Sequence, residues 1–166
     1  NYGSRIGWYH HFYLPLILIE MEHGNMSLLG SLDWLTLCMA GAGACAAQLL
    51  VPRRGATAGG SGGTMDSNKA LARRGLLINL AFGDYIEACF PFLERDGYLN
   101  AAVYAASAGA GAICATGGGA ASTAYLAAPL AVALGTEPRR LAAAASVAFG
   151  LPFVVGAFSN LRAARG

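Results

Sequence analysis

Three apolar stretches constrain this chain more than any other feature of its sequence, because each is long enough to cross a lipid bilayer as a helix. They cover residues 28–51, 101–134 and 141–160, and about 20 apolar residues suffice for one crossing. Hydrophobic residues make up 55% of the 166 residues and charged residues only 12%. This is more apolar surface than a soluble core of that length needs. The sequence therefore predicts an all-α, polytopic membrane protein.

Two further apolar segments are interrupted or short. Residues 75–93 have the length of a span but contain Asp84 and Glu87, whereas residues 12–19 are too short to span. Such segments are typical of re-entrant or broken helices, whose backbone lines a cavity instead of facing lipid. We therefore expect about four to five transmembrane helices together with re-entrant segments. Residues 101–134 are long enough to bend or to make two short passes.

A basic, glycine-rich segment separates two apolar halves. Residues 52–74 contain a single acid, Asp66, and five cations: Arg53, Arg54, Lys69, Arg73 and Arg74. The positive-inside rule places such a loop in the cytoplasm, and its glycine- and serine-rich centre is typical of a flexible linker. The predicted organisation is a first membrane half at 1–51, a cytoplasmic linker at 52–74 and a second membrane half at 75–166. The topology after residue 74 stays open, because a re-entrant segment would reverse every later helix.

Small residues and cysteines within the apolar stretches indicate packing. Glycine and alanine dominate residues 40–44 and 105–111, where small side chains let helix backbones approach closely. Glycines 117–119 can also break a long helix and open a site lined by backbone, but no glycine run has the order of a phosphate-binding loop. Because the cysteines have no CxxC spacing, we expect small buried side chains, no metal site and no cofactor. They are Cys38, Cys45, Cys89 and Cys114.

Ionisable and aromatic residues crowd the start of the chain, where residues 1–8 lack the pattern of a cleavable signal peptide. His10 and His11 lie among tyrosines, a phenylalanine and a tryptophan. They belong either to an aromatic belt at the membrane surface or to a functional site. Three further ionisable residues fit an aqueous loop ahead of the helix that begins near residue 27: Glu20, Glu22 and His23.

Acids within the apolar segments are the strongest candidates for function, since an ionisable group at membrane depth costs roughly 2.5–3.5 kcal/mol and rarely persists without a partner. Asp84 and Glu87 would share one face of a helix, between Gly83 and Pro91, which mark a distorted segment. Carboxylates there can accept hydrogen bonds from a sugar or polyol, or carry a coupling proton. The structural alternative is an internal ion pair with Arg73, Arg74 or Arg95. Asp33 lies one turn into an apolar helix. It either stabilises the start of that helix or has a functional role.

One segment resembles a known family. Gly83-Asp84-Tyr85-Ile86-Glu87-Ala88-Cys89-Phe90-Pro91 is similar to the G-x-x-x-E-x-x-x-P segment of membrane enzyme IIC components of the phosphoenolpyruvate-dependent sugar phosphotransferase system, in the fructose/mannitol branch. Upstream, His10-His11-Phe12-Tyr13-Leu14-Pro15-Leu16 is similar to the histidine, aromatic and proline stretch of that family. The likeness covers residues 8–134. Asp84 adds a second acid, Tyr85 and Ile86 replace smaller or polar residues, and the chain is shorter than such a permease domain, as in a partial or half-length relative.

The resemblance implies a re-entrant hairpin in which Glu87 contacts sugar hydroxyls. It predicts a multi-pass permease component of the bacterial inner (cell) membrane that takes up a sugar or sugar alcohol. If it belongs to an enzyme, this chain is the transport part, and cytoplasmic phosphotransferase components carry the phosphoryl group. Asp84 and Glu87 would accept hydrogen bonds from the substrate, while His11, with His10 beside it, would donate or accept another.

The expected partners are a sugar or polyol, the lipid bilayer, and further copies or other membrane chains, but no nucleic acid. Two other functions stay open. The chain is a structural subunit of a larger membrane complex if its acids pair with neighbouring chains. It is an ion- or proton-coupled transporter of a small anion if His11 and Arg74 matter more than Glu87.

Overall fold

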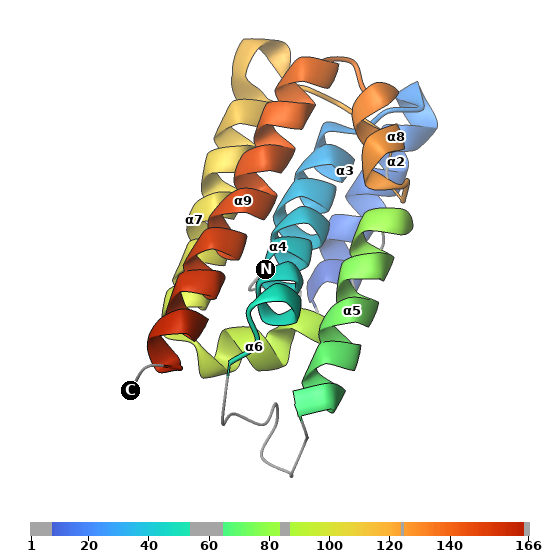
Figure 1. Ribbon diagram of the computed structural model, residues 1–166. Helices are drawn as coiled ribbons and strands as arrows, with labels where there is room; N and C mark the ends of the chain where they lie inside the picture. Colours follow the sequence, from blue (N-terminus) through green and yellow to red (C-terminus); the bar gives the residue numbers. More distant parts are fainter. Residues whose placement is uncertain (1–7, 54–64, 84–86, 124, 165–166) are drawn as a thin grey trace.

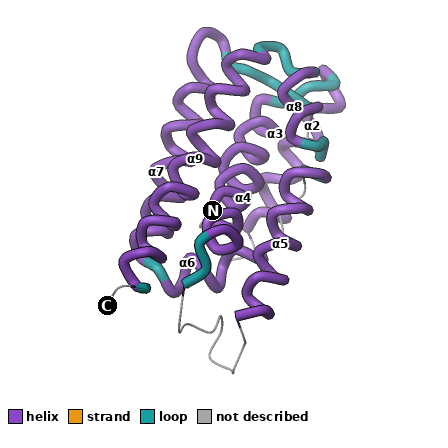
Figure 2. The backbone as a smooth tube through the Cα atoms, in the orientation of Figure 1, coloured by secondary structure: helices purple, strands orange, loops and turns teal. Residues whose placement is uncertain are grey.

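The computed structural model describes residues 8–53, 65–83, 87–123 and 125–164, and within these ranges the chain is helical apart from turns and loops (Figure 1, Figure 2). The helices lie side by side, and the loops gather at the two ends of the bundle. Across the described ranges, the only strand-like feature is an isolated antiparallel bridge between Ser27 and Ser122. The prediction of an all-α protein is confirmed.

The elements range from single turns to a helix of 26 residues. In chain order they are η1 (Tyr9–Tyr13), α2 (Leu14–Gly24), α3 (Leu28–Asp33), η2 (Trp34–Met39), α4 (Ala40–Leu50), α5 (Met65–Ala81), η3 (Glu87–Cys89), α6 (Phe90–Arg95), α7 (Gly97–Ala115), η4 (Thr116–Gly118), α8 (Ala128–Ala133) and α9 (Pro138–Ala163). The segments η1 and η2 are π-helical, and η3 and η4 are 3₁₀-helical.

Three helices in the described part of the chain are long and apolar enough to cross a membrane. They are Leu28–Leu50, which joins α3, η2 and α4, then Gly97–Gly118 and Pro138–Ala163. They match the three apolar stretches of the sequence, except that residues 101–134 provide one span-length helix, a loop and the six residues of α8, and not two passes.

The glycine run at 117–119 ends the second of these helices. Gly117, Gly118 and Gly119 have φ angles of 60°, 95° and 85°, a region that residues with a β-carbon rarely adopt. The carbonyl of Thr116 accepts a hydrogen bond of 2.5 Å from Nη1 of Arg140 and one of 3.3 Å from the amide of Gly119. The predicted helix break is therefore confirmed.

One end of the bundle carries several arginines. There α4 ends, α5 and α7 begin, and α9 ends (Figure 1). We call it the basic end, because Arg53, Arg95 and Arg162 gather there around a cavity. Helix α5 starts at Met65, so residues 65–74 of the predicted linker belong to this helix.

The helix Leu28–Leu50 occupies the centre of the bundle. Its apolar window is 78% buried, against 33% for each of the other two span-length helices. Close packing against α9 depends on small residues, as predicted for residues 40–44. A β-carbon on Gly43 would overlap the carbonyl oxygen of Phe149, and one on Gly156 would lie 2.9 Å from Cβ of Ala47.

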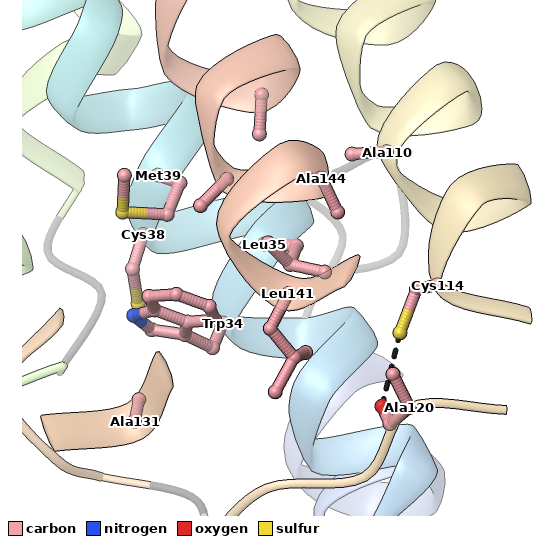
Figure 3. Close-up of a cluster of buried hydrophobic side chains, with 12 residues drawn as sticks. Trp34, Leu35, Cys38, Met39, Ala110, Cys114, Ala120, Ala131, Leu141 and Ala144 are labelled. Atoms are coloured by element: carbon pink, nitrogen blue, oxygen red, sulfur yellow. Dashed lines mark hydrogen bonds between the residues drawn. The ribbon is translucent and has the colours of Figure 1, made fainter. Parts of the chain in front are cut away.

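A cluster of buried side chains joins this central helix to α7 and α9 (Figure 3). Trp34 and Leu35 of the central helix pack beside Leu141 of α9, and the thiol of Cys114 in α7 donates to the carbonyl of Ala120 at 3.1 Å. All four cysteines are buried and free of disulfides, which confirms the prediction of small buried side chains.

Candidate functional site

A buried carboxylate in the central helix forms the middle of the candidate site. Asp33 is the last residue of α3, directly before the π-helix η2, and only 8% of it is exposed. It accepts a hydrogen bond of 2.9 Å from the hydroxyl of Tyr9, which lies in the π-helix η1. Local π-helical turns occur frequently at functional sites, and here two of them flank the same hydrogen bond.

The hydroxyl of Tyr9 also lies 3.4 Å from the hydroxyl of Tyr125, which belongs to the loop between η4 and α8. The backbone of Tyr125 has a φ of 60°, a left-handed conformation that costs a residue with a side chain of order 1–3 kcal/mol and clusters at functional sites. The structure thus brings together three side chains from distant parts of the sequence: Tyr9, Asp33 and Tyr125.

The loop that carries Tyr125 is held on several sides. Ser122 exchanges two backbone hydrogen bonds with Ser27, of 3.0 and 3.3 Å. Its hydroxyl donates to the carbonyl of Ala131 at 2.5 Å, and the amide of Ala121 donates to Oγ1 of Thr136 at 3.0 Å. Residues 119–123 and 125–127, called the site loop from here on, are therefore tied to the start of α3, to α8 and to the segment that precedes α9.

Gly83, which precedes the acidic segment of residues 84–87, also contacts the site loop. Gly83, with a φ of 59°, packs so tightly that a β-carbon there would overlap the backbone of Leu126, the residue after Tyr125. Ala88 in η3 packs against the middle of α5, since a β-carbon on Gly75 would lie 3.0 Å from Cβ of Ala88. The chain at η3, after Gly83, therefore lies back alongside α5. The site loop thus contacts both Tyr9 near the start of the chain and Gly83, the residue before Asp84.

The predicted site residues have different outcomes. Asp33 is the last residue of α3, whose start is capped by Ser27, so it lies outside the first turn of that helix. His10 and His11 are exposed, although Tyr9, whose ring lies 5.2 Å from that of His10, points toward Asp33. Glu87 begins η3, but its side chain, like all of Asp84, lies outside the described residues.

Burial raises the pKa of the Tyr9 hydroxyl well above its ordinary value of 10.0, and the Asp33 carboxylate and Tyr125 raise it further. Burial likewise raises the pKa of Tyr13 to about 12, with smaller contributions from Asp33 and Glu20. Both hydroxyls therefore keep their protons at physiological pH, and Tyr9 remains a donor to Asp33.

The aqueous loop predicted for Glu20, Glu22 and His23 is wrong, because all three residues lie in α2. Glu20 accepts hydrogen bonds from the Ser27 hydroxyl at 2.5 Å and from the amides of Leu28 and Leu29 at 2.9 and 3.0 Å. Burial tends to raise the pKa of Glu20, but these three hydrogen bonds outweigh it and lower the pKa below 4.5. The carboxylate thus stabilises the amino end of the central helix.

This cap predicts a pH dependence of stability. Because the folded-state pKa of Glu20 is lowered, its stabilising contribution is complete above the ordinary pKa and is lost as the pH falls through the folded pKa. Thermal unfolding of the protein in detergent should show a loss of stability on acidification that is smaller in Glu20→Gln, with a stability difference of about 1 kcal/mol at neutral pH. Glu22→Gln, an exposed acid on the same helix, is the control, and equal profiles for Glu20→Gln and the unaltered chain would contradict the cap.

Two buried polar atoms near the central helix have no hydrogen-bond partner among the described residues. They are Nε1 of Trp34, in a side chain 3% exposed, and Oδ1 of Asn79 in α5, a residue that is fully buried. Buried polar groups are normally satisfied, so such exceptions call for an explanation such as a bound polar molecule. The indole and the amide carbonyl could supply one donor and one acceptor to a polar ligand.

Sequence patterns gave no indication of the tyrosines or of these two atoms. Tyrosines look like interfacial or core residues in an apolar chain, and only the contact between Tyr9 and Asp33 distinguishes them. The positive φ of Tyr125 has no local signal either, because no glycine or asparagine stands there.

Metal ligation has no support within the described ranges, where no three His, Cys, Asp or Glu side chains come together. Comparisons of the chain with protein-family models, with curated protein sequences and with solved structures find no match.

Proposed function

We propose that the chain is a membrane permease component that takes up a sugar or sugar alcohol, coupled to phosphorylation by partner proteins. The observation that carries this proposal is that Tyr9 and Gly83 both lie against the site loop, beside the buried carboxylate of Asp33. In a span-length apolar helix, an ionisable group turned toward the bundle interior is by default a functional one.

The chemistry of the site suits a ligand with several hydroxyl groups. A carboxylate accepts hydrogen bonds from adjacent hydroxyls, and a tyrosine hydroxyl can both donate and accept. Tyr125 is 44% exposed, so its ring offers an apolar face to a ligand that hydrogen-bonds to Tyr9 and Asp33. Trp34 Nε1 and Asn79 Oδ1 are buried and would offer one further donor and one further acceptor.

The path of α5 supports a re-entrant segment within this proposal. Gly83 lies at the site loop, and Ala88 lies beside Gly75, so the chain turns back toward the end at which α5 began. In a re-entrant hairpin, which enters and leaves the membrane on the same side, polar residues near the turn can reach a substrate. Glu87 lies in the second half of this hairpin, at the start of η3. The membrane part would then hold three spanning helices and one re-entrant hairpin.

The charge distribution supports an orientation in the bacterial inner membrane. The basic end carries Arg53, Arg95 and Arg162, and the positive-inside rule directs such an end to the cytoplasm. Cytoplasmic phosphotransferase partners would meet the protein there. Apolar side chains exposed on α9, such as Val154 and Leu151, would face lipid, a further copy of the chain or another membrane subunit.

Sugar binding by the purified protein tests the proposal. Calorimetric titration with a panel of hexoses and hexitols should give a ligand whose affinity falls about tenfold or more in Asp33→Asn, because a hydrogen bond to a charged group contributes about 1.5–3 kcal/mol. Glu87→Gln should weaken the same ligand, and Tyr125→Phe should have a smaller effect.

Asp66→Asn, which changes an exposed acid in the first turn of α5, is the matched control and should bind as the unaltered chain does. Thermal unfolding of each variant establishes that it is folded. The proposal is wrong if no hexose or hexitol binds, or if Asp33→Asn and Glu87→Gln both bind with unchanged affinity. Loss of co-purifying membrane subunits in Glu87→Gln, without any sugar binding, would favour a structural subunit instead.

A further inference from the structure

The basic end of the bundle contains a cavity that the proposed transport site does not use. It has a volume of about 540 Å³ and lies between the amino end of α7, the last two turns of α9 and the segment after α4. Its charged lining consists of Arg53, Arg95, Arg162 and Asp96. A cavity of this size falls in the range of small-molecule sites.

The charges of this lining are unequal, with three guanidinium groups and one carboxylate. The carboxylate of Asp96 is 4% exposed and already has several donors. It accepts from the amides of Tyr98 and Leu99 at 3.0 and 3.1 Å, from the hydroxyl of Ser159 at 2.5 Å and from Nη1 of Arg53 at 3.4 Å. It caps α7 and offsets one guanidinium, so the residues that line the cavity carry more positive than negative charge.

The excess of positive charge affects the pKa of Arg95. Burial lowers the pKa of its guanidinium, the like charge of Arg53 lowers it further, and Asp96 partly opposes both. Arg53 and Arg95 repel each other, and the cavity lining offers them a single carboxylate. A bound anion would relieve this repulsion.

Buried polar side chains hold Arg95 in place. Its Nη2 donates to Oε1 of Gln48 at 3.4 Å, and Nε2 of Gln48 donates to Oδ1 of Asn160 at 3.5 Å. Asn160 in turn donates to the carbonyl of Val51 at 2.8 Å. Gln48 and Asn160 are 5% and 1% exposed, so this chain of hydrogen bonds is part of the core and positions the guanidinium before any ligand arrives.

We propose that this cavity binds a phosphate group through Arg53, Arg95 and Arg162. Guanidinium groups match the oxygens of phosphate in planar, two-pronged hydrogen bonds. Arg162 projects from the last turn of α9 over the ring of Phe158, 5.8 Å from its centre. Its charge also offsets the carbonyl end of α9, which would otherwise repel an anion.

The phosphate can belong to a lipid headgroup or to a soluble phosphorylated molecule. The cavity lies where two span-length helices, α7 and α9, have their ends. In a bilayer spanned by these helices, their ends would lie in the headgroup region, where basic pockets bind anionic lipids. Phosphate binding here depends on the charge and shape of the cavity and does not require that the chain transport a sugar.

Two titrations test the site. Inorganic phosphate is added to the full chain in neutral detergent, and binding is measured by calorimetry and by the shift in unfolding temperature. In parallel, the chain is placed in nanodiscs of phosphatidylcholine with or without phosphatidylglycerol. We expect at least one of the two probes to bind, and Arg95→Gln and Arg162→Gln each to weaken it about tenfold or more.

The control is Arg139→Gln, which removes the same charge from an exposed position at the opposite end of α9. Binding of phosphate in detergent identifies a soluble ligand, and an effect of phosphatidylglycerol without it identifies a lipid. Arg162→Gln alters an exposed side chain, so it keeps the test valid if Arg95→Gln does not fold. The proposal fails if neither probe binds, or if Arg139→Gln weakens binding as much as the cavity variants do.

Discussion

Gly43→Ala should destabilise the protein by about 3 kcal/mol or more, the largest effect that we expect from a single methyl group in this chain. The added carbon would overlap the carbonyl oxygen of Phe149 in the facing helix α9. Backbone cannot move aside as a flexible side chain can, so α4 and α9 would have to separate along their contact. Unfolding of the purified protein, by heat or by titration with a denaturing detergent, measures the change.

Gly150→Ala provides a matched control for this prediction. Gly150 lies in the middle of α9, and a β-carbon there has open space, with nothing within 4 Å. The same substitution should leave the stability unchanged or raise it by up to about 1 kcal/mol, because alanine favours a helix more than glycine does. If the two variants were equally stable, the close contact between α4 and α9 would be wrong.

Gly83→Ala is the second large effect that we expect, and it tests the site itself. Its φ of 59° imposes a strain of roughly 1–2 kcal/mol on alanine, and the β-carbon would also overlap the backbone of Leu126. We expect a loss of about 3 kcal/mol in stability. Because Leu126 follows Tyr125, displacement of the site loop should also weaken binding of the sugar or polyol under the proposed function.

Substitutions of two other glycines distinguish the backbone strain from the overlap with Leu126. Gly118 has a φ of 95°, but a β-carbon added there would have nothing within 4 Å, so Gly118→Ala should show the strain alone. Gly24→Ala has neither the strain nor a neighbour within 4 Å and should change stability by less than about 0.5 kcal/mol. The contact between Gly83 and the site loop is contradicted if Gly83→Ala costs no more than Gly118→Ala.

Several features of the fold could be predicted because they depend on nearby residues. The helix Pro138–Ala163 follows from an apolar run with proline in its first turn, and the break after Thr116 follows from consecutive glycines. The start of α5 could not be placed in this way, because Met65 follows a glycine-rich segment and begins a helix with several charged residues. Its apolar contacts with α4, such as Gly75 against Cys45, come from the rest of the fold.

In the candidate site, too, some features depend on nearby residues and others on the rest of the fold. An acid in an apolar helix makes Asp33 a candidate, with a role at the helix start as the alternative, since burial of a charge is costly wherever it occurs. Its partners could not be inferred: Tyr9 is 24 residues away, and Tyr125 is 116 residues from Tyr9. The sequence predicts a loop at Glu20, because nothing in its neighbourhood indicates that this carboxylate caps the next helix through amides eight and nine residues along the chain.

The sequence by itself determined that the chain is helical, which three stretches are long and apolar enough to span a membrane, and where one of them ends. These properties depend on residue type over a few turns, such as the length of an apolar run or the freedom of glycine at positive φ. The tertiary structure alone decided which polar groups meet, both at Asp33 and in the arginine cavity of the basic end. A hydrogen bond between distant residues requires atoms to come within about 3 Å, and that distance is set by how whole helices pack against one another.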